Sequence, residues 1–184
     1  MHIRPFIIAV LLGGISLSSA IAGEPVVSGS FHTVLMLGRQ CITVPKTDVD
    51  LRPGARLEMR PCQNSADQIF DWNVITFEIT FNGLCVDAFR VGAGPSQSGD
   101  PVGLWYCQKN DHQKWFLDHK GASRVEAFNI VAGGSPSSEL CLDIADDASV
   151  DGARLTIQNC HGGDHQWFRL TPSPPLTGRL LSRR

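Results

Sequence analysis

The sequence predicts an all-β fold built from three similar repeats. Apolar residues occur in short runs, such as Val74-Ile75, Phe77 and Ile79, and no long stretch has helical periodicity. Six cysteines fall into three pairs with similar spacing inside each pair, and a glutamine with an aromatic residue two positions later recurs after each pair. A fixed internal period of this kind is typical of a repeat architecture.

The repeats are in register at four landmarks. The paired cysteines are 21, 22 and 19 positions apart, and they are Cys41 and Cys62, Cys85 and Cys107, and Cys141 and Cys160. A glycine lies eight positions before each second cysteine: Gly54, Gly99 and Gly152. A glutamine follows six positions after it, and an aromatic residue two later: Gln68 and Phe70, Gln113 and Trp115, Gln166 and Phe168. The matched spacing predicts one disulfide within each repeat.

Each repeat is expected to contain a few short strands. One carries the first cysteine (84–86 and 140–142), one precedes the second cysteine (154–157), and one follows the glutamine. A single unit cannot bury its apolar face, so we expect the three to close around a shared axis. Phe70, Trp115 and Phe168 should then lie in the core. The longer interval before the third repeat predicts an insertion within 121–138.

The two ends of the chain differ in composition from the repeats. Residues 1–22 combine a weakly basic start, an apolar run and Ala20-Ile21-Ala22, which predicts a cleaved secretory signal peptide. The protein is therefore expected to be secreted, either extracellular or periplasmic, where disulfides persist. Residues 173–184 are rich in proline and arginine and are expected to form a mobile tail. A net charge of −2 offers no basic surface for nucleic acid, and we expect no membrane insertion.

The triplicated pattern resembles the ricin B-type lectin family. Its elements are Cys-x-Asp, a cysteine about 20 residues later, and a Gln-x-Trp step, over residues 28–172. The resemblance implies a β-trefoil with up to three sugar pockets, one in each repeat. It also implies a protein that binds glycans, galactose-type or other neutral sugars, rather than an enzyme, and that uses no cofactor.

A sugar pocket needs three kinds of group. A carboxylate accepts hydrogen bonds from two neighbouring hydroxyls, an aromatic ring covers the apolar C–H face, and amide or imidazole groups complete the hydrogen bonding. Family sites draw these from Cys-x-Asp, from the position two before the second cysteine, and from the two residues that open Gln-x-Trp. The second repeat matches every position, with Asp87, Trp105, His112 and Gln113. It is expected to be the main carbohydrate-binding site.

The other repeats match less completely. The third has Asp143, His165 and Gln166, but Gln158 stands at the aromatic position. The first has Thr43, Arg60 and Asp67 in place of the binding residues, so Gln68 is expected to serve structure only.

Other functions remain open at this point. The chain is also similar to the glycan-binding delivery subunits of cytolethal distending toxins, so a delivery subunit of a bacterial toxin, with a toxin or enzyme partner subunit, is an alternative. A protein-binding trefoil, such as a protease inhibitor, is another. His161 and His165 lie beside Cys160, but a disulfide would occupy that cysteine, so no metal site is expected. Asp143 with Asp146-Asp147 is expected to belong to a solvated loop rather than to a glycosidase pair.

The signal peptide gives a first prediction. Cleavage after Ala22 should leave exported protein that begins at Gly23. The intact mass of the secreted material, compared with that of the reduced protein, measures the N-terminus and the disulfides together. A retained N-terminus would contradict the prediction.

Overall fold

The computed structural model describes residues 29–35, 39–45, 52–73, 75–90, 94–118, 129–133, 138–145 and 150–172. The expected signal peptide and C-terminal tail lie outside this part of the chain. Within it, no helix has the length and apolar character needed to span a membrane.

The described residues form three successive groups of four strands. The first group is β1 (Gly29–Leu35), β2 (Gln40–Thr43), β3 (Glu58–Pro61) and β4 (Phe70–Asn73). The second is β5 (Glu78–Phe81), β6 (Leu84–Ala88), β7 (Val102–Tyr106) and β8 (Trp115–Asp118). The third is β9 (Asn129–Ala132), β10 (Leu140–Ile144), β11 (Leu155–Asn159) and β12 (Phe168–Pro172). A short 3₁₀ turn precedes the last strand of each group: η1 (Ala66–Gln68), η2 (Asp111–Gln113) and η3 (Asp164–Gln166).

One local expectation is wrong. Ile75 and Phe77 lie in the turn between β4 and β5 rather than in a strand, and Phe77 has a positive φ of 60°. The side chain of Asn73 closes this turn, because its Oδ1 accepts the backbone N–H groups of Ile75 at 2.9 Å and of Thr76 at 3.1 Å. Of the apolar run, only Ile79 lies in a strand, and Val74 falls outside the described residues.

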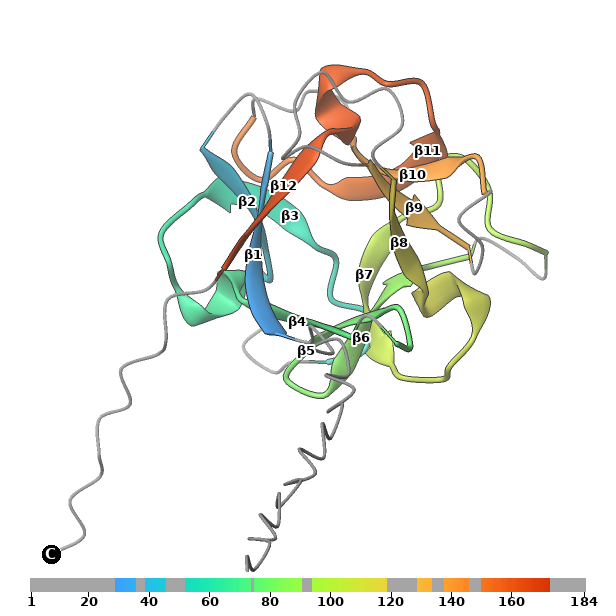
Figure 1. Ribbon diagram of the computed structural model, residues 1–184, viewed down its shortest axis with the longest axis horizontal. Coiled ribbons are helices and arrows are strands. Elements are labelled where there is room, and N and C mark those ends of the chain that lie inside the picture. The colour runs from blue at the N-terminus through green and yellow to red at the C-terminus, as the bar shows by residue number, and fades with distance from the viewer. Residues whose placement is uncertain are drawn as a thin grey trace, which may run out of the picture.

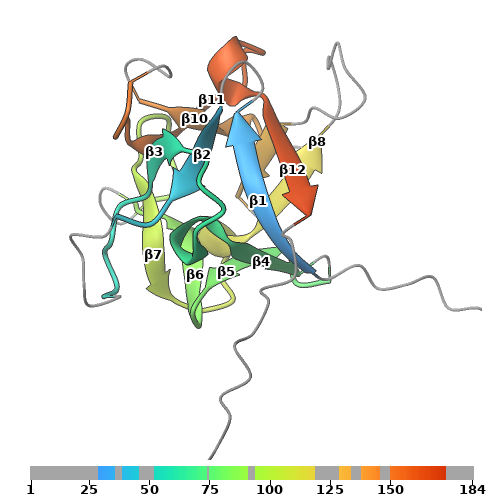
Figure 2. The ribbon, with the colours of Figure 1, turned by 90° about the vertical axis from the view of Figure 1, so that its left-hand side faces the viewer.

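Antiparallel pairing links the three groups into a closed body. β12 pairs with β1 from Phe31–Pro172 to Leu35–Phe168, which joins the two ends of the repeat region. Figure 1 shows the groups arranged around a common centre, and Figure 2 shows β1 and β12 side by side. The predicted all-β fold of three repeats is confirmed.

The three glycines that lie eight positions before the second cysteines connect one repeat to the next. Gly54, Gly99 and Gly152 have φ values of 103°, 94° and 88°, a region that glycine adopts without steric cost. Each donates its N–H at 2.7 Å to a carbonyl of the following repeat, Leu104, Ile157 and Met59 respectively. The hydrogen bonds form a cycle, so the glycine landmark holds the repeats together.

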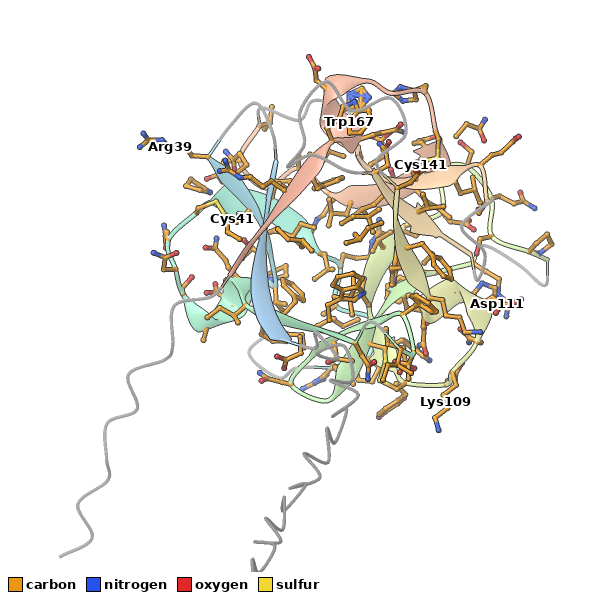
Figure 3. The ribbon with its side chains drawn as sticks, viewed as in Figure 1. Arg39, Cys41, Lys109, Asp111, Cys141 and Trp167 are labelled. Carbon is orange, nitrogen blue, oxygen red and sulfur yellow. A yellow bond between two sulfur atoms is a disulfide. The ribbon has the colours of Figure 1, made fainter. Side chains whose placement is uncertain are left out.

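The aromatic landmarks form the core. Phe70, Trp115 and Phe168 have at most 1% of their surface exposed and belong to one apolar cluster. The indole Nε1 of Trp115 donates to the Val86 carbonyl at 2.9 Å, which satisfies its one polar group. Trp72, Leu117 and Leu170 pack against the same cluster. Figure 3 shows side chains filling the space between the ribbons.

The three predicted disulfides are all present. Cys41–Cys62, Cys85–Cys107 and Cys141–Cys160 each lie within one repeat. Each closes a local loop of about 20 residues, worth about 3 kcal/mol in the chain-entropy model. The longer interval before the third repeat falls in two connections. Residues 119–128 join β8 to β9 and residues 133–139 join β9 to β10, whereas 74–77 and 82–83 serve in the second repeat.

Trp115→Ala should lower the free energy of unfolding by about 3–5 kcal/mol, because it removes a fully buried aromatic and orphans the Val86 carbonyl. Trp105→Ala is the matched control, since that indole is 37% exposed. Urea denaturation of both variants measures the difference. Equal losses would contradict the assignment of Trp115 to the core.

Candidate functional site

The glutamine of each repeat is buried and makes the same three kinds of hydrogen bond, and this set of bonds is called the glutamine frame below. Gln68, Gln113 and Gln166 are at most 2% exposed. Each Oε1 accepts the N–H of the residue after the second cysteine, at 2.8, 2.7 and 2.9 Å. Each Nε2 donates to the carbonyl of the residue before that cysteine, at 2.9, 2.8 and 3.0 Å. The same Nε2 also donates to the side chain two positions after the first cysteine: Thr43, Asp87 or Asp143.

In the second repeat this frame orients a carboxylate. Asp87 lies on β6 and is 7% exposed, and its Oδ2 accepts from Gln113 Nε2 at 2.7 Å. Both amide hydrogens of Gln113 are used inside the protein. Gln113, predicted as a binding residue, therefore has no amide hydrogen left for a ligand.

Two aromatic side chains form the wall beside Asp87. Trp105 lies on β7, and its ring meets that of Phe89 edge to face, with centroids 6.0 Å apart. Gly103 lies opposite Asp87 on the neighbouring strand. A Cβ at Gly103 would collide with the Ala55 carbonyl and lie 2.6 Å from the Phe89 ring, so glycine gives this wall its room. Trp105 is exposed enough to offer a face to a ligand.

These groups surround a cavity of about 290 Å³. Asp87, Trp105 and His112 line it as predicted, and the structure adds four residues that the sequence pattern missed: Phe89, Arg90, Gln108 and Asn110. Phe89, Arg90 and Asn110 do not recur at their offsets in the other repeats, and Gln108 recurs only as Gln63 of the first repeat, so the triplicated pattern gave no signal for them. A lining residue that does not recur in all three repeats can be recognised only from the folded structure.

Burial is the main cause of the pKa shifts of Asp87 and His112 in this cavity, and neighbouring charges modify both shifts. Burial raises the pKa of the Asp87 carboxyl, and the Gln113 hydrogen bond and the charges of His112 and Arg90 partly oppose that rise. Burial, followed by the Arg90 charge, lowers the pKa of the His112 imidazole. His112 is therefore neutral near pH 7, and its Nδ1 lies 2.9 Å from Ser96 Oγ.

The first repeat has a cavity at the equivalent place but different chemistry. This cavity of about 520 Å³ is lined by Thr43, Arg60, Asp67 and neighbouring residues. Arg60, at the aromatic position, forms an ion pair with Glu58 at 2.7 Å. Gln68 donates to the Thr43 hydroxyl at 2.9 Å, so the frame persists without a carboxylate.

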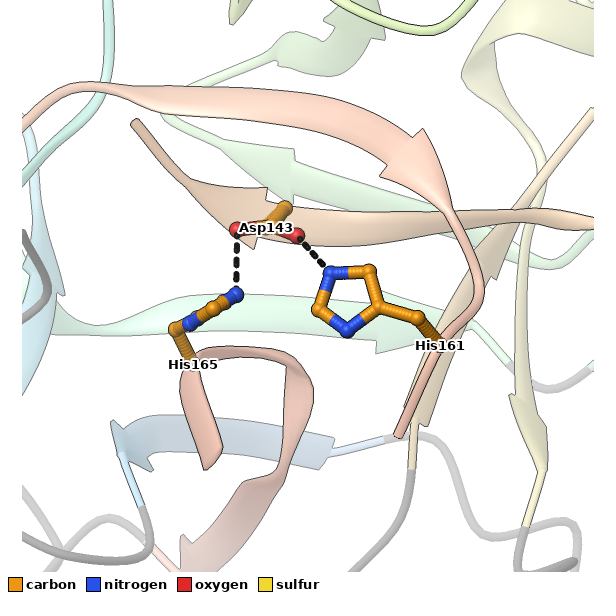
Figure 4. Close-up of side chains that lie close together, drawn as sticks. All are labelled: Asp143, His161 and His165. Atoms are coloured by element: carbon orange, nitrogen blue, oxygen red, sulfur yellow. Dashed lines mark ion pairs between the residues drawn. The ribbon is translucent and has the colours of Figure 1, made fainter. Parts of the chain in front are cut away.

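The third repeat brings its predicted residues together and adds another. Asp143 is 2% exposed and accepts from Gln166 Nε2 at 2.6 Å. His165 Nε2 lies 3.8 Å from Asp143 Oδ1, and His161 Nε2 lies 3.4 Å from Oδ2. Figure 4 shows both imidazoles turned toward this one carboxylate. Gln158, at the aromatic position, instead accepts a hydrogen bond from Ser98.

The arrangement is similar to that of several solved structures. The designed three-fold symmetric protein ThreeFoil has a TM-score of 0.65 and 20% identity, over 78% of this chain and 98% of that one. A mosquitocidal holotoxin has a TM-score of 0.63 and 11% identity, over 80% of this chain and 17% of the holotoxin. The ricin B-like lectin of Macrolepiota procera, solved with lactose, has a TM-score of 0.61 and 15% identity, over 78% and 94%. No curated protein sequence matches significantly.

Three four-stranded repeats closed on one core, with glutamine-supported cavities at equivalent places in the first two repeats and a glutamine-held carboxylate in the third, define a β-trefoil of the lectin class. The family model for the ricin-type beta-trefoil lectin domain matches residues 28–132. The chain belongs to this family.

The raised pKa of Asp87 predicts how its contribution to stability depends on pH. The native carboxyl binds its proton more tightly than the unfolded one, so the free energy of unfolding falls as pH rises from the ordinary aspartate pKa through the raised value. Wild type should therefore lose stability relative to Asp87→Asn across that window. Urea denaturation of both proteins between acidic and neutral pH measures the difference. A relative gain by wild type would contradict the direction of the shift.

Proposed function

We propose that this protein is a secreted lectin that binds a galactose-type or other neutral sugar mainly in the cavity of the second repeat. The observation that carries the proposal is the Asp87 carboxylate, held by Gln113 Nε2 at 2.7 Å and facing a cavity that Trp105 also lines. This combination supplies the acceptor and the aromatic face that a sugar requires.

Asp87 has capacity left for a ligand. A carboxylate offers about four lone-pair positions, and Gln113 uses one of them on Oδ2. Two vicinal hydroxyls can therefore donate to the same carboxylate while the C–H face of the sugar packs on Trp105. His112, Asn110 and Gln108 line the same cavity and can bond the remaining hydroxyls. Asp143, His165 and Gln166 of the third repeat stay a prediction for a second, weaker site.

The chemistry of the cavity favours binding without catalysis. Asp87 is the one carboxylate among the residues that line it, whereas most glycosidases use two flanking the scissile bond. The three disulfides support an oxidising compartment, as secretion requires. A toxin delivery subunit or an accessory domain of an enzyme would use the same sugar site, and both stay alternatives.

Asp87→Asn should greatly weaken or abolish sugar binding while leaving the fold intact. The asparagine oxygen still accepts from Gln113, but the side chain loses its charge, and each charge-assisted hydrogen bond is worth about 1.5–3 kcal/mol. Two such losses sum to about 3–6 kcal/mol, comparable to the roughly 4 kcal/mol of a millimolar site. A glycan array identifies the sugar, and calorimetric titration, with lactose as the first probe, measures the affinity.

Two further variants complete this test. Trp105→Ala should weaken binding by less than Asp87→Asn does, because it removes packing rather than ionic hydrogen bonds. Thr43→Ser, at the equivalent position of the first repeat, should leave the affinity unchanged. Normal binding by Asp87→Asn, or an equal loss in Thr43→Ser, would rule out the second repeat as the main site. An array that retains no glycan would overturn the proposed function.

A further inference from the structure

We propose that the third repeat binds a divalent transition metal of the zinc class between Asp143, His161 and His165. The three side chains offer one carboxylate oxygen and two imidazole nitrogens, and these atoms all lie within 4.8 Å of one another. Two imidazoles and one carboxylate form a donor set that suits zinc and its neighbours. This inference is independent of sugar binding in the second repeat.

The two distances from the carboxylate to the imidazoles are close to those of a zinc coordination sphere. Tetrahedral zinc with ligand bonds of 2.0–2.1 Å places its donor atoms about 3.3 Å apart. Asp143 Oδ2 and His161 Nε2 are 3.4 Å apart, and Asp143 Oδ1 and His165 Nε2 are 3.8 Å apart. All three donor atoms lie within 4.8 Å of one another, so the exposed imidazoles would have to turn further toward the carboxylate to share one ion. With three protein ligands, the fourth position is left for water or another small ligand.

The burial pattern is that of an accessible site with a fixed anchor. The Asp143 side chain is 3% exposed, whereas the His161 and His165 side chains are 47% and 41% exposed. Gln166 donates to the Asp143 carboxylate at 2.6 Å and accepts the backbone N–H of His161 at 2.9 Å. One buried amide thus positions two of the three ligands, the kind of outer support that ligands at metal sites commonly have.

Gly163 lies close to the rings of both His161 and His165. A Cβ at this position would lie 2.7 Å from His161 Cε1 and 3.3 Å from His165 Cε1. The backbone here has φ −67° and ψ 155°, which any residue adopts, so glycine is not required by conformation. The equivalent residues are Ser65 and Asn110, with φ values of −90° and −89°. The third repeat therefore needs glycine only to let the two imidazoles converge.

The third repeat differs from the second at two positions that matter for ligand binding. His161 and His165 stand at the positions of Gln108 and His112, so the third repeat has a second imidazole where the second has an amide. It also has Gln158 in place of the stacking ring of Trp105. Relative to the second repeat, the third therefore lacks an aromatic face and has one more imidazole that can coordinate a metal. The sequence places Cys160 beside these histidines, and its disulfide removes it as a metal donor. The fold supplies Asp143 as the third donor instead.

Metal binding requires a defined proton rearrangement. The Nδ1 of His161 accepts the Gly163 N–H at 3.1 Å, so the neutral ring carries its proton on Nε2, facing Asp143. When Nε2 coordinates the ion, the ring proton resides on Nδ1 and the exposed Gly163 N–H bonds to water instead. No net proton is lost from a neutral imidazole in this exchange.

Calorimetric titration of Zn²⁺ into the full-length, disulfide-intact protein, freed of metal by chelator, tests the proposal. One ion should bind per chain, and Co²⁺ as a substitute should give visible absorption bands that disappear on addition of Zn²⁺. His161→Ala should weaken Zn²⁺ binding by about 100-fold or more, beyond the 10–100-fold typical of outer-shell changes. Because His161 is exposed, this variant should fold. Asp143→Asn, which keeps the shape seen by Gln166, should have a similar effect.

Two other variants separate a built site from general surface attraction. Gly163→Ser retains all three ligands but crowds the imidazoles, so it should weaken Zn²⁺ binding. Asp164→Asn removes an exposed carboxylate from the same turn and should leave binding unchanged. The absence of Zn²⁺ binding at millimolar concentration would show that these residues form ion pairs only and would overturn the proposal. Binding unaffected by His161→Ala and Asp143→Asn would do the same, and neither result bears on Asp87 and the sugar.

Discussion

The buried glutamine amide of each repeat is the interaction on which both the fold and the candidate sites depend. Gln68, Gln113 and Gln166 each make the same three hydrogen bonds, which fasten the turn after the second cysteine to the strand that carries the first. A buried amide left without partners would cost about 1–3 kcal/mol for each group. The glutamine therefore tolerates only neighbours that satisfy it, which explains why its offset from the second cysteine is the same in all three repeats.

The same constraint leaves one position free to vary. The side chain two residues after the first cysteine has only to accept one hydrogen bond from the glutamine. Thr43, Asp87 and Asp143 all do so, at 2.9, 2.7 and 2.6 Å. The choice of hydroxyl or carboxylate thus changes the chemistry presented to solvent without changing the frame. The repeats share a structure for this reason and can still differ in what they bind.

The parts of the fold that follow from repetition were predictable from the sequence. The cysteine pairs and the core aromatics each appear three times at matching positions, and the structure confirms both. It also confirms the all-β class. Ile75 and Phe77 were misassigned because a local Asn73 side chain overrides the apolar pattern and closes a turn. Phe89 could not be recognised as a wall residue, because its room depends on Gly103 in a neighbouring strand. The meeting of His161 with Asp143 likewise depends on tertiary placement.

The buried state of Asp87 shows how the frame sustains a group that is unfavourable for folding. Taking a carboxylate out of water destabilises its charged form, and the raised pKa reflects this. A threonine, as in the first repeat, satisfies the glutamine without that penalty. An ionised side chain at this position therefore gains nothing for the fold that a neutral one would not also give. In the proposed function its advantage arises when a ligand with paired hydroxyls replaces the lost water, and the energetic penalty supports that proposal.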